Sequence, residues 1–198
     1  MIRFFRRLIF SLAAFILMMN ATSFAIVVNP TQEQVQAAIA KGKAAVLSKT
    51  PPSQLYWRFG SPETLHAHGF LMTKLGGLAV LAAHYAFRAE SPTEQDIVRI
   101  TKESALQVSV SVFGSSPEFG KDSYMVLNQG DRLIKPTQVR FDAQARRSDV
   151  WPNDPPYQAK VVASFPYEHF DPVQPTTISV FPGEGGEVQF DLDFSRIP

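Results

Sequence analysis

The chain has four histidines, the side chains best suited to metal binding and to proton transfer near neutral pH. On a helix, His66 and His68 would point about 200° apart, so they would not share a metal ion. His66 and His84 would share a helical face but lie roughly 27 Å apart along it. Zinc-binding helices place two histidines four residues apart, and this pair spacing does not occur here. The chain also lacks cysteine, so we predict no metal site and no cofactor.

The fourth histidine, His169, lies beside Glu168 and Asp171 in the segment 166–172. A histidine oriented by a carboxylate can act as a general base, so one hypothesis is a hydrolase or small-ligand-binding protein that uses this loop. The sequence has no Gly-x-Ser-x-Gly, Ser-x-x-Lys or Gly-x-x-x-x-Gly-Lys motif that would supply a nucleophile or bind a phosphate. A non-enzymatic function is therefore the preferred prediction.

Two proline-stiffened loops, 144–158 and 166–176, carry aromatic and arginine side chains of the kind that anchor protein interfaces. We predict a partner-binding surface made of Trp151, Tyr157, Tyr167 and Phe170, with Arg146 and Arg147 at its rim. The alternative is that these aromatic rings fold back and plug the open ends of a β-sandwich. A third set of polar side chains, Glu187, Asp191 and Asp193, alternates along the last predicted strand and is expected to face solvent.

Three helices are predicted before residue 105. Thr31 and Gln34 form a capping box that opens a helix over 31–49. Ser61 and the proline after it indicate a second helix from 61 to about 88. A second capping box at 91–94 predicts a short helix to about 104, with Ile97 and Ile100 facing inward.

The segment 69–87 is apolar nearly all round, with Lys74 as its one charged residue. Such a helix is buried either in protein or in a membrane. A lone lysine inside a bilayer is costly, so burial in protein is preferred. A membrane-associated subunit that inserts helix 69–87 is the alternative, and membrane contact is not favoured.

After residue 104 apolar and polar residues alternate, which is typical of half-buried strands. About seven strands are separated by turns rich in proline and glycine. This pattern resembles the immunoglobulin architecture, an antiparallel β-sandwich, although the disulfide of true immunoglobulin domains is missing. We therefore predict an α+β fold in which a three-helix region, 26–104, packs on an immunoglobulin-like sandwich, 105–198.

The first 25 residues have the form of a signal peptide: three arginines, an apolar run, and small residues before a cleavage site at Ala25. An uncleaved membrane anchor is the alternative. Removing those arginines leaves 16 basic residues against the 18 acidic ones, a net charge of −2. This charge speaks against nucleic-acid binding, which needs clustered lysine and arginine.

Taken together, these features predict an exported protein that is periplasmic or extracellular, and they favour a location in a bacterial envelope. Small exported eukaryotic domains usually carry disulfides, and this chain has no cysteine. The predicted function is non-enzymatic: binding of a protein partner in the envelope, or a structural role there.

Overall fold

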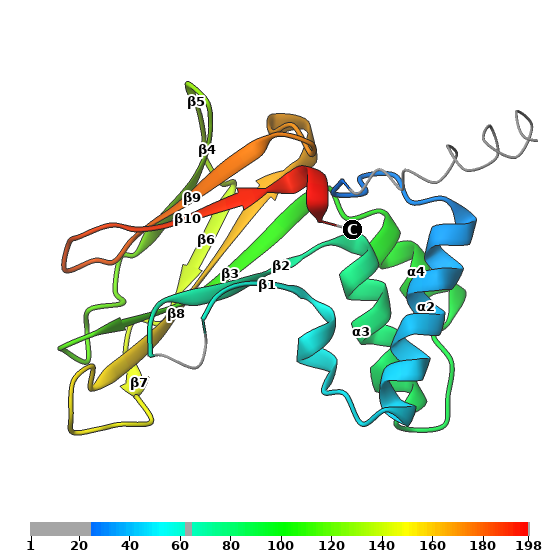
Figure 1. Cartoon of the computed structure of the whole chain (residues 1–198), viewed down its shortest axis with the longest axis horizontal. Coiled ribbons are helices and arrows are strands. Elements are labelled where there is room, and N and C mark those ends of the chain that lie inside the picture. The colour runs from blue at the N-terminus through cyan, green and yellow to red at the C-terminus, as the bar shows by residue number, and fades with distance from the viewer. Residues whose placement is uncertain (1–24, 62–64, 198) are drawn as a thin grey trace, which may run out of the picture.

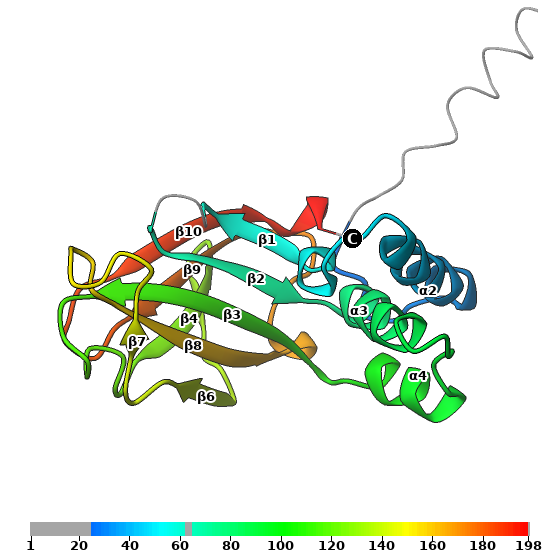
Figure 2. The same cartoon turned by 90° about the horizontal axis from the view of Figure 1, so that it is seen from below.

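The computed structural model describes residues 25–61 and 65–197. These residues form three α-helices and ten strands arranged in two antiparallel sheets, which confirms the α+β class. The helices gather at one end of the two sheets (Figures 1 and 2). The predicted signal peptide, 1–25, lies outside the described residues except for Ala25.

The helices begin at side-chain caps. They are α2 (Gln32–Leu47), α3 (Lys74–Ala86) and α4 (Glu94–Thr101), with 3-10 turns η1 (Pro52–Leu55), η3 (Tyr167–His169) and η4 (Phe194–Arg196). The predicted capping box of α2 is confirmed, because Thr31 accepts a hydrogen bond from the Gln34 backbone and the Gln34 side chain accepts one from the Thr31 backbone. The cap of α4 is Thr93, two residues after the predicted position.

The larger sheet has the strand order β1-β2-β3-β8-β6, and β7 also pairs with β8. Its strands are β1 (Trp57–Gly60), β2 (His68–Met72), β3 (Ala105–Gly114), β6 (Gln138–Phe141), β7 (Arg146–Arg147) and β8 (Tyr157–Pro166). The long strands β3 and β8 form its centre, with Val110 opposite Val161.

The smaller sheet has the order β10-β9-β4-β5. Its strands are β4 (Tyr124–Gln129), β5 (Arg132–Ile134), β9 (Pro175–Phe181) and β10 (Val188–Asp193). As predicted, Asp191 and Asp193 are exposed on β10, and Glu187 just before it is exposed too.

One core joins the two sheets. Buried side chains of β3 and β8, such as Val108 and Phe165, belong to the same apolar cluster as Leu127 and Ile178 of the smaller sheet. A second, smaller cluster lies between α2 and α3 and includes Ile97 and Ile100 of α4 at its border, as predicted. Here α2 and α3 come so close that a Cβ added at Gly42 would lie 2.1 Å from a backbone oxygen of α3.

The predicted helix over 61–88 is wrong in its first half. Where the structure describes that half, β2 occupies 68–72, pairs with β1 and β3, and α3 starts only at Lys74. Residues 62–64 lie outside the described residues. The physical reason is that both side-chain faces of β2 are at least half-buried, so the strand reads as an apolar run, which periodicity does not distinguish from a buried helix.

The region 26–104, predicted to be helical, therefore also supplies two strands to the larger sheet. Residues 105–197 contain eight strands, one more than the approximate number predicted, because the two-residue strand β7 was not anticipated. None of the helices within residues 25–61 and 65–197 has both the length and the apolarity needed to cross a bilayer.

Candidate functional site

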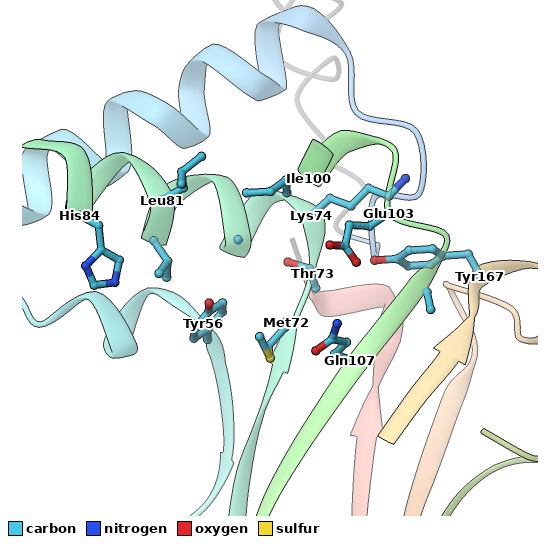
Figure 3. Close-up of a pocket in the computed structure, with 13 residues that line it drawn as sticks. Tyr56, Met72, Thr73, Lys74, Leu81, His84, Ile100, Glu103, Gln107 and Tyr167 are labelled. Carbon is cyan, nitrogen blue, oxygen red and sulfur yellow. The ribbon is translucent and has the colours of Figure 1, made fainter. Parts of the chain in front are cut away.

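A cavity of about 250 Å³ lies where the helices meet the larger sheet. Its walls come from α3, α4, the ends of β2 and β3, and the turn after β8 (Figure 3). The lining residues are Tyr56, Met72, Thr73, Lys74, Gly77, Val80, Leu81, His84, Ile100, Glu103, Ala105, Gln107 and Tyr167. The cavity has apolar walls and a polar end at Lys74, Glu103 and Tyr167.

The direct passage from β2 into α3 positions this polar end. β2 ends at Met72, and Thr73 alone separates it from the first residue of the helix, Lys74. The Thr73 hydroxyl caps α3 by accepting a hydrogen bond from the backbone of Gly76, at 3.1 Å. Lys74 is thereby held at the junction of helix and sheet.

Lys74 is a buried cation, with 6% of its surface exposed. Its Nζ donates a hydrogen bond to the backbone oxygen of Thr101, 2.7 Å away, near the end of α4. The same nitrogen lies 5.2 Å from the centroid of the Tyr167 ring, within range of a cation–π interaction. Burial lowers the pKa of Lys74, and the negative charge of Glu103 acts in the opposite direction.

Tyr167 is also buried, with 7% exposure, and its hydroxyl makes no hydrogen bond to any described residue. Figure 3 shows this hydroxyl pointing toward Thr73 and Glu103, whereas the Lys74 nitrogen points away from Met72 and Tyr56. Burial raises the pKa of Tyr167, Glu103 raises it further, and the nearby backbone N–H of Lys74 opposes both. The phenol is therefore protonated at neutral pH and has a proton to donate, although the surrounding side chains cover its oxygen.

A second, more open hollow of about 620 Å³ lies across the start of α3 from the cavity. It shares Tyr56 and Thr73 with the cavity and is bordered by α2, η1 and β1. Its charged lining residues are Lys41 and Arg58. Within the part of the chain that the structure describes, no cluster of three or more His, Asp or Glu side chains is suited to hold a metal ion.

The prediction that Tyr167 and Phe170 are exposed on a binding loop is wrong. Tyr167 is 7% exposed and Phe170 is 5% exposed, and both belong to the core between the sheets. The turn η3 directs both rings inward, where Phe170 packs edge-on against Phe194 with 5.7 Å between ring centroids. For these two residues the structure agrees with the plugging alternative.

The other predicted interface residues lie at the end of the sheet that is remote from the helices (Figure 1). Trp151 is 43% exposed, and the guanidinium of Arg147 lies 3.9 Å from its ring centroid. Arg146 is exposed and donates a hydrogen bond of 2.6 Å to the Gln158 side chain. Tyr157 is half-buried and packs against the core. Binding of a partner by these residues stays a prediction.

The loop 166–172 does not bring His169 and Asp171 together. The carboxylate near the His169 ring is that of Glu168, at 3.7 Å, and both side chains are exposed. Asp171 instead accepts a hydrogen bond from the backbone of Val173, and its own backbone is bound by the buried side chain of Gln129. Of the two carboxylates considered, Glu168 is therefore the one beside the ring, and a histidine-based site in this loop stays a prediction.

Sequence reasoning missed the cavity because its residues come from segments far apart in the chain, from Tyr56 to Tyr167. One signal was present: Lys74 interrupts an apolar stretch, and a buried lysine needs a polar partner. Tyr167 was singled out, but for exposure rather than for its hydroxyl.

The chain has weak structural neighbours among solved proteins. The IgNAR antibody domain C1 matches with a TM-score of 0.31 and 9% identity, over 52% of this chain and 84% of that chain. The archaellum periplasmic stator protein FlaG from Sulfolobus acidocaldarius has a TM-score of 0.31 and 11% identity, over 46% and 89%. The archaellum periplasmic stator complex of FlaF and FlaG from the same organism matches with a TM-score of 0.28 and 12% identity, over 45% of this chain and 77% of that chain.

TM-scores this low carry no argument about the fold or function of this chain. No protein-family model and no curated protein matches it.

Proposed function

We propose that the protein is a non-enzymatic binding protein and that it holds a small ligand in the cavity at Tyr167. The observation that carries this proposal is the Tyr167 hydroxyl, which is buried at the cavity wall without a hydrogen-bond partner among the described residues. A buried polar group of this kind costs stability unless something bonds to it. A ligand with a hydrogen-bond acceptor would supply the missing partner once a small shift of the cavity wall uncovers the hydroxyl.

This proposal keeps the small-ligand hypothesis for the segment 166–172 but moves it to other residues. Tyr167 replaces His169 as the group that meets the ligand, because His169 is exposed and Tyr167 lines the cavity. The walls contributed by Met72, Leu81 and Ile100 would hold the apolar part of the ligand.

The test is a titration with benzyl alcohol, an aromatic ring that carries one hydroxyl, followed by ¹H–¹⁵N NMR on the protein purified after expression of the full chain. We expect saturable shifts at the backbone amides of 73–77 and 105–107. The variant Gly77→Leu should abolish them, because a Cβ at Gly77 has only Ile100 near it, at 3.4 Å, so the side chain would enter the cavity.

The matched control for the cavity-filling variant is Ala37→Leu, which places the same side chain in the neighbouring hollow. It should leave the shifts unchanged. The proposal is wrong if benzyl alcohol shifts no cavity amide in the wild-type protein, or if Gly77→Leu binds it as well as the wild type does.

We propose a second function, partner binding in the envelope, for the surface around Trp151. The Arg147–Trp151 stack supports it, because exposed tryptophan and arginine side chains often dominate interface energetics. The segment between them is held in place by a hydrogen bond of 2.5 Å from the Ser148 hydroxyl to the backbone of Pro155. An ordered loop loses less conformational entropy on binding than a mobile one.

The second exposed tryptophan, Trp57, provides a matched control for this surface, since 39% of it is exposed against 43% of Trp151. In affinity capture from an envelope extract, Trp151→Ala should lose a partner that the wild type and Trp57→Ala both retain. Melting temperatures should show that both variants are folded. Equal loss of the partner in the two variants would contradict the proposed surface.

We also propose that the protein is exported, with cleavage after Ala25, and that its two sheets form an immunoglobulin-like sandwich. Cleavage there would keep all the core residues that the structure describes in the mature chain, because Ile26 is the first of them. Intact-mass measurement of protein from an envelope fraction should give a chain that starts at Ile26. A chain that still carries residues 1–25 would favour the uncleaved anchor.

A further inference from the structure

We propose that the cavity selects an uncharged ligand, one whose apolar body carries an amide or hydroxyl group at the Tyr167 end. This inference rests on the proposed small-ligand function and adds the chemical class of the ligand. It follows from the charges and hydrogen-bonding groups at the polar end of the cavity.

Two opposite charges flank the Tyr167 hydroxyl. The Lys74 ammonium lies 5.2 Å from the centroid of the Tyr167 ring, and the Glu103 carboxylate lines the cavity beside it (Figure 3). The Glu103 charge acts on both Lys74 and Tyr167. An anion placed at the hydroxyl would be repelled by Glu103 and attracted by Lys74, and a cation the reverse, so the two charges largely cancel for an ion of either sign.

Neither charge offers an ion of the opposite sign a close partner inside the cavity. Lys74 uses one of its three N–H groups on the backbone of Thr101, and its nitrogen points away from the cavity interior. Glu103 is exposed at the rim, where solvent weakens its interaction with an ion of either sign. His84 is the one imidazole among the lining residues, and it is exposed on the wall formed by α3. An ion would therefore give up its hydration without gaining a full partner, whereas an uncharged group loses much less.

The hydrogen-bonding groups fit an amide or a hydroxyl. The Tyr167 phenol needs an acceptor, and the Gln107 side chain at the cavity floor offers both a donor and an acceptor. An amide presents a carbonyl oxygen to the phenol and N–H groups to Glu103 or Gln107. The volume of about 250 Å³ exceeds the roughly 150 Å³ of an engineered cavity that takes up benzene, so a six-membered ring with one such group has room.

Benzamide, benzoate and benzamidinium test this inference, because the three have nearly the same shape and carry charges of zero, minus one and plus one at neutral pH. Each is titrated into the protein from full-chain expression, and binding is followed at the amides of 73–77 and 105–107 by ¹H–¹⁵N NMR. We expect benzamide to bind at least about tenfold more tightly than either ion.

The variant Glu103→Gln identifies the source of the selectivity. Removing this carboxylate should raise benzoate affinity and lower benzamidinium affinity, each by about threefold or more, and leave benzamide within about twofold. The matched control is Glu94→Gln, which removes an exposed carboxylate from α4 that does not line the cavity. It should leave all three affinities unchanged.

The result that overturns the inference is tighter binding of benzoate or benzamidinium than of benzamide at the cavity amides, which would leave the proposed small-ligand function standing. Equal affinity for the three probes overturns it as well. Absence of cavity shifts with benzyl alcohol and with all three probes overturns the proposed function and this inference together.

Discussion

Because the Tyr167 hydroxyl is buried without a partner among the described residues, we expect that removing it does not destabilise the fold. Tyr167→Phe keeps the ring and its two described ring contacts: the Lys74 ammonium, 5.2 Å from its centroid, and the Phe170 ring at 5.8 Å. The variant removes only the phenol oxygen. In the free protein that oxygen has no hydrogen-bond partner among the described residues.

The magnitude follows from the cost of an unpaired buried polar group, which is about 1–3 kcal/mol. Phenylalanine removes that cost but also loses the van der Waals contacts of one oxygen. We therefore expect the free energy of unfolding of Tyr167→Phe to lie between the wild-type value and about 1 kcal/mol above it. For a chain of this size, 1 kcal/mol corresponds to a rise in melting temperature of roughly 2–4 °C.

Urea unfolding with linear extrapolation measures this difference, and the slope of the free energy against urea should not change. Tyr85→Phe is the matched control, because the Tyr85 hydroxyl donates a hydrogen bond of 2.6 Å to Asp96. The same chemical deletion at Tyr85 should lower stability. The two variants therefore have opposite expected signs.

A loss of more than about 1 kcal/mol in Tyr167→Phe would refute the reasoning, because it would mean that the hydroxyl has a strong partner in the free protein. The proposed ligand site would then lose its main support. A gain in stability together with weaker benzamide binding would show that the hydroxyl is kept for a ligand rather than for the fold.

Three further predictions concern the elements that build the site. Gly42→Ala should lower the free energy of unfolding by about 1–3 kcal/mol, because its Cβ would lie 2.1 Å from a backbone oxygen of α3. Gly77→Ala should raise the free energy of unfolding by up to about 1 kcal/mol, because alanine favours a helix more than glycine does. Gln129→Leu should cost at least about 2 kcal/mol in urea unfolding, because it breaks three hydrogen bonds to residues 171 and 176. Burial lowers the pKa of Lys74 below its usual 10.5, so the unfolded chain binds more protons than the folded one at a pH between the two pKa values. The free energy of unfolding of the wild type, measured in urea relative to Lys74→Met, should therefore rise as the pH approaches 10.5 from below.

Local signals predicted much of the secondary structure. The capping box at Thr31 and Gln34 lies within one turn of helix, so four residues suffice to recognise it. Most strands from β3 onward were recognisable because apolar and polar residues alternate along them, and in β10 the exposure alternates as well. The two-residue strand β7 was the exception.

The β1–β2 hairpin was not predictable in the same way. Both side-chain faces of its second strand are at least half-buried, so its apolar residues run directly into those of α3 without a change in composition. Thr73, followed three residues later by Gly76, was the one local sign that a helix starts inside this stretch. Thr73 reads as a cap only once β2 is recognised as a strand.

The cavity depends on tertiary contacts that no local pattern records. Lys74 and Tyr167 are far apart in the chain and meet only because β3 pairs with β8 and because α3 follows β2 directly. Aromatic loop residues are common both in cores and at interfaces, so composition alone could not assign Tyr167 and Phe170 to the core. Trp151 could be recognised as exposed because its loop is rich in polar residues and proline.

The pairing of β2 with β3 has a consequence for any attempt to isolate the C-terminal half of the protein. Along residues 107–111, β3 is covered by β2, and Val108, Ser109 and Val110 are all buried. A fragment that starts at residue 105 would expose this stretch of backbone N–H and C=O groups along a long strand with valines at 108 and 110. Strands of that kind recruit other chains, so we expect the fragment to aggregate. The β1–β2 hairpin thus covers the edge of β3 and prevents other chains from pairing with it.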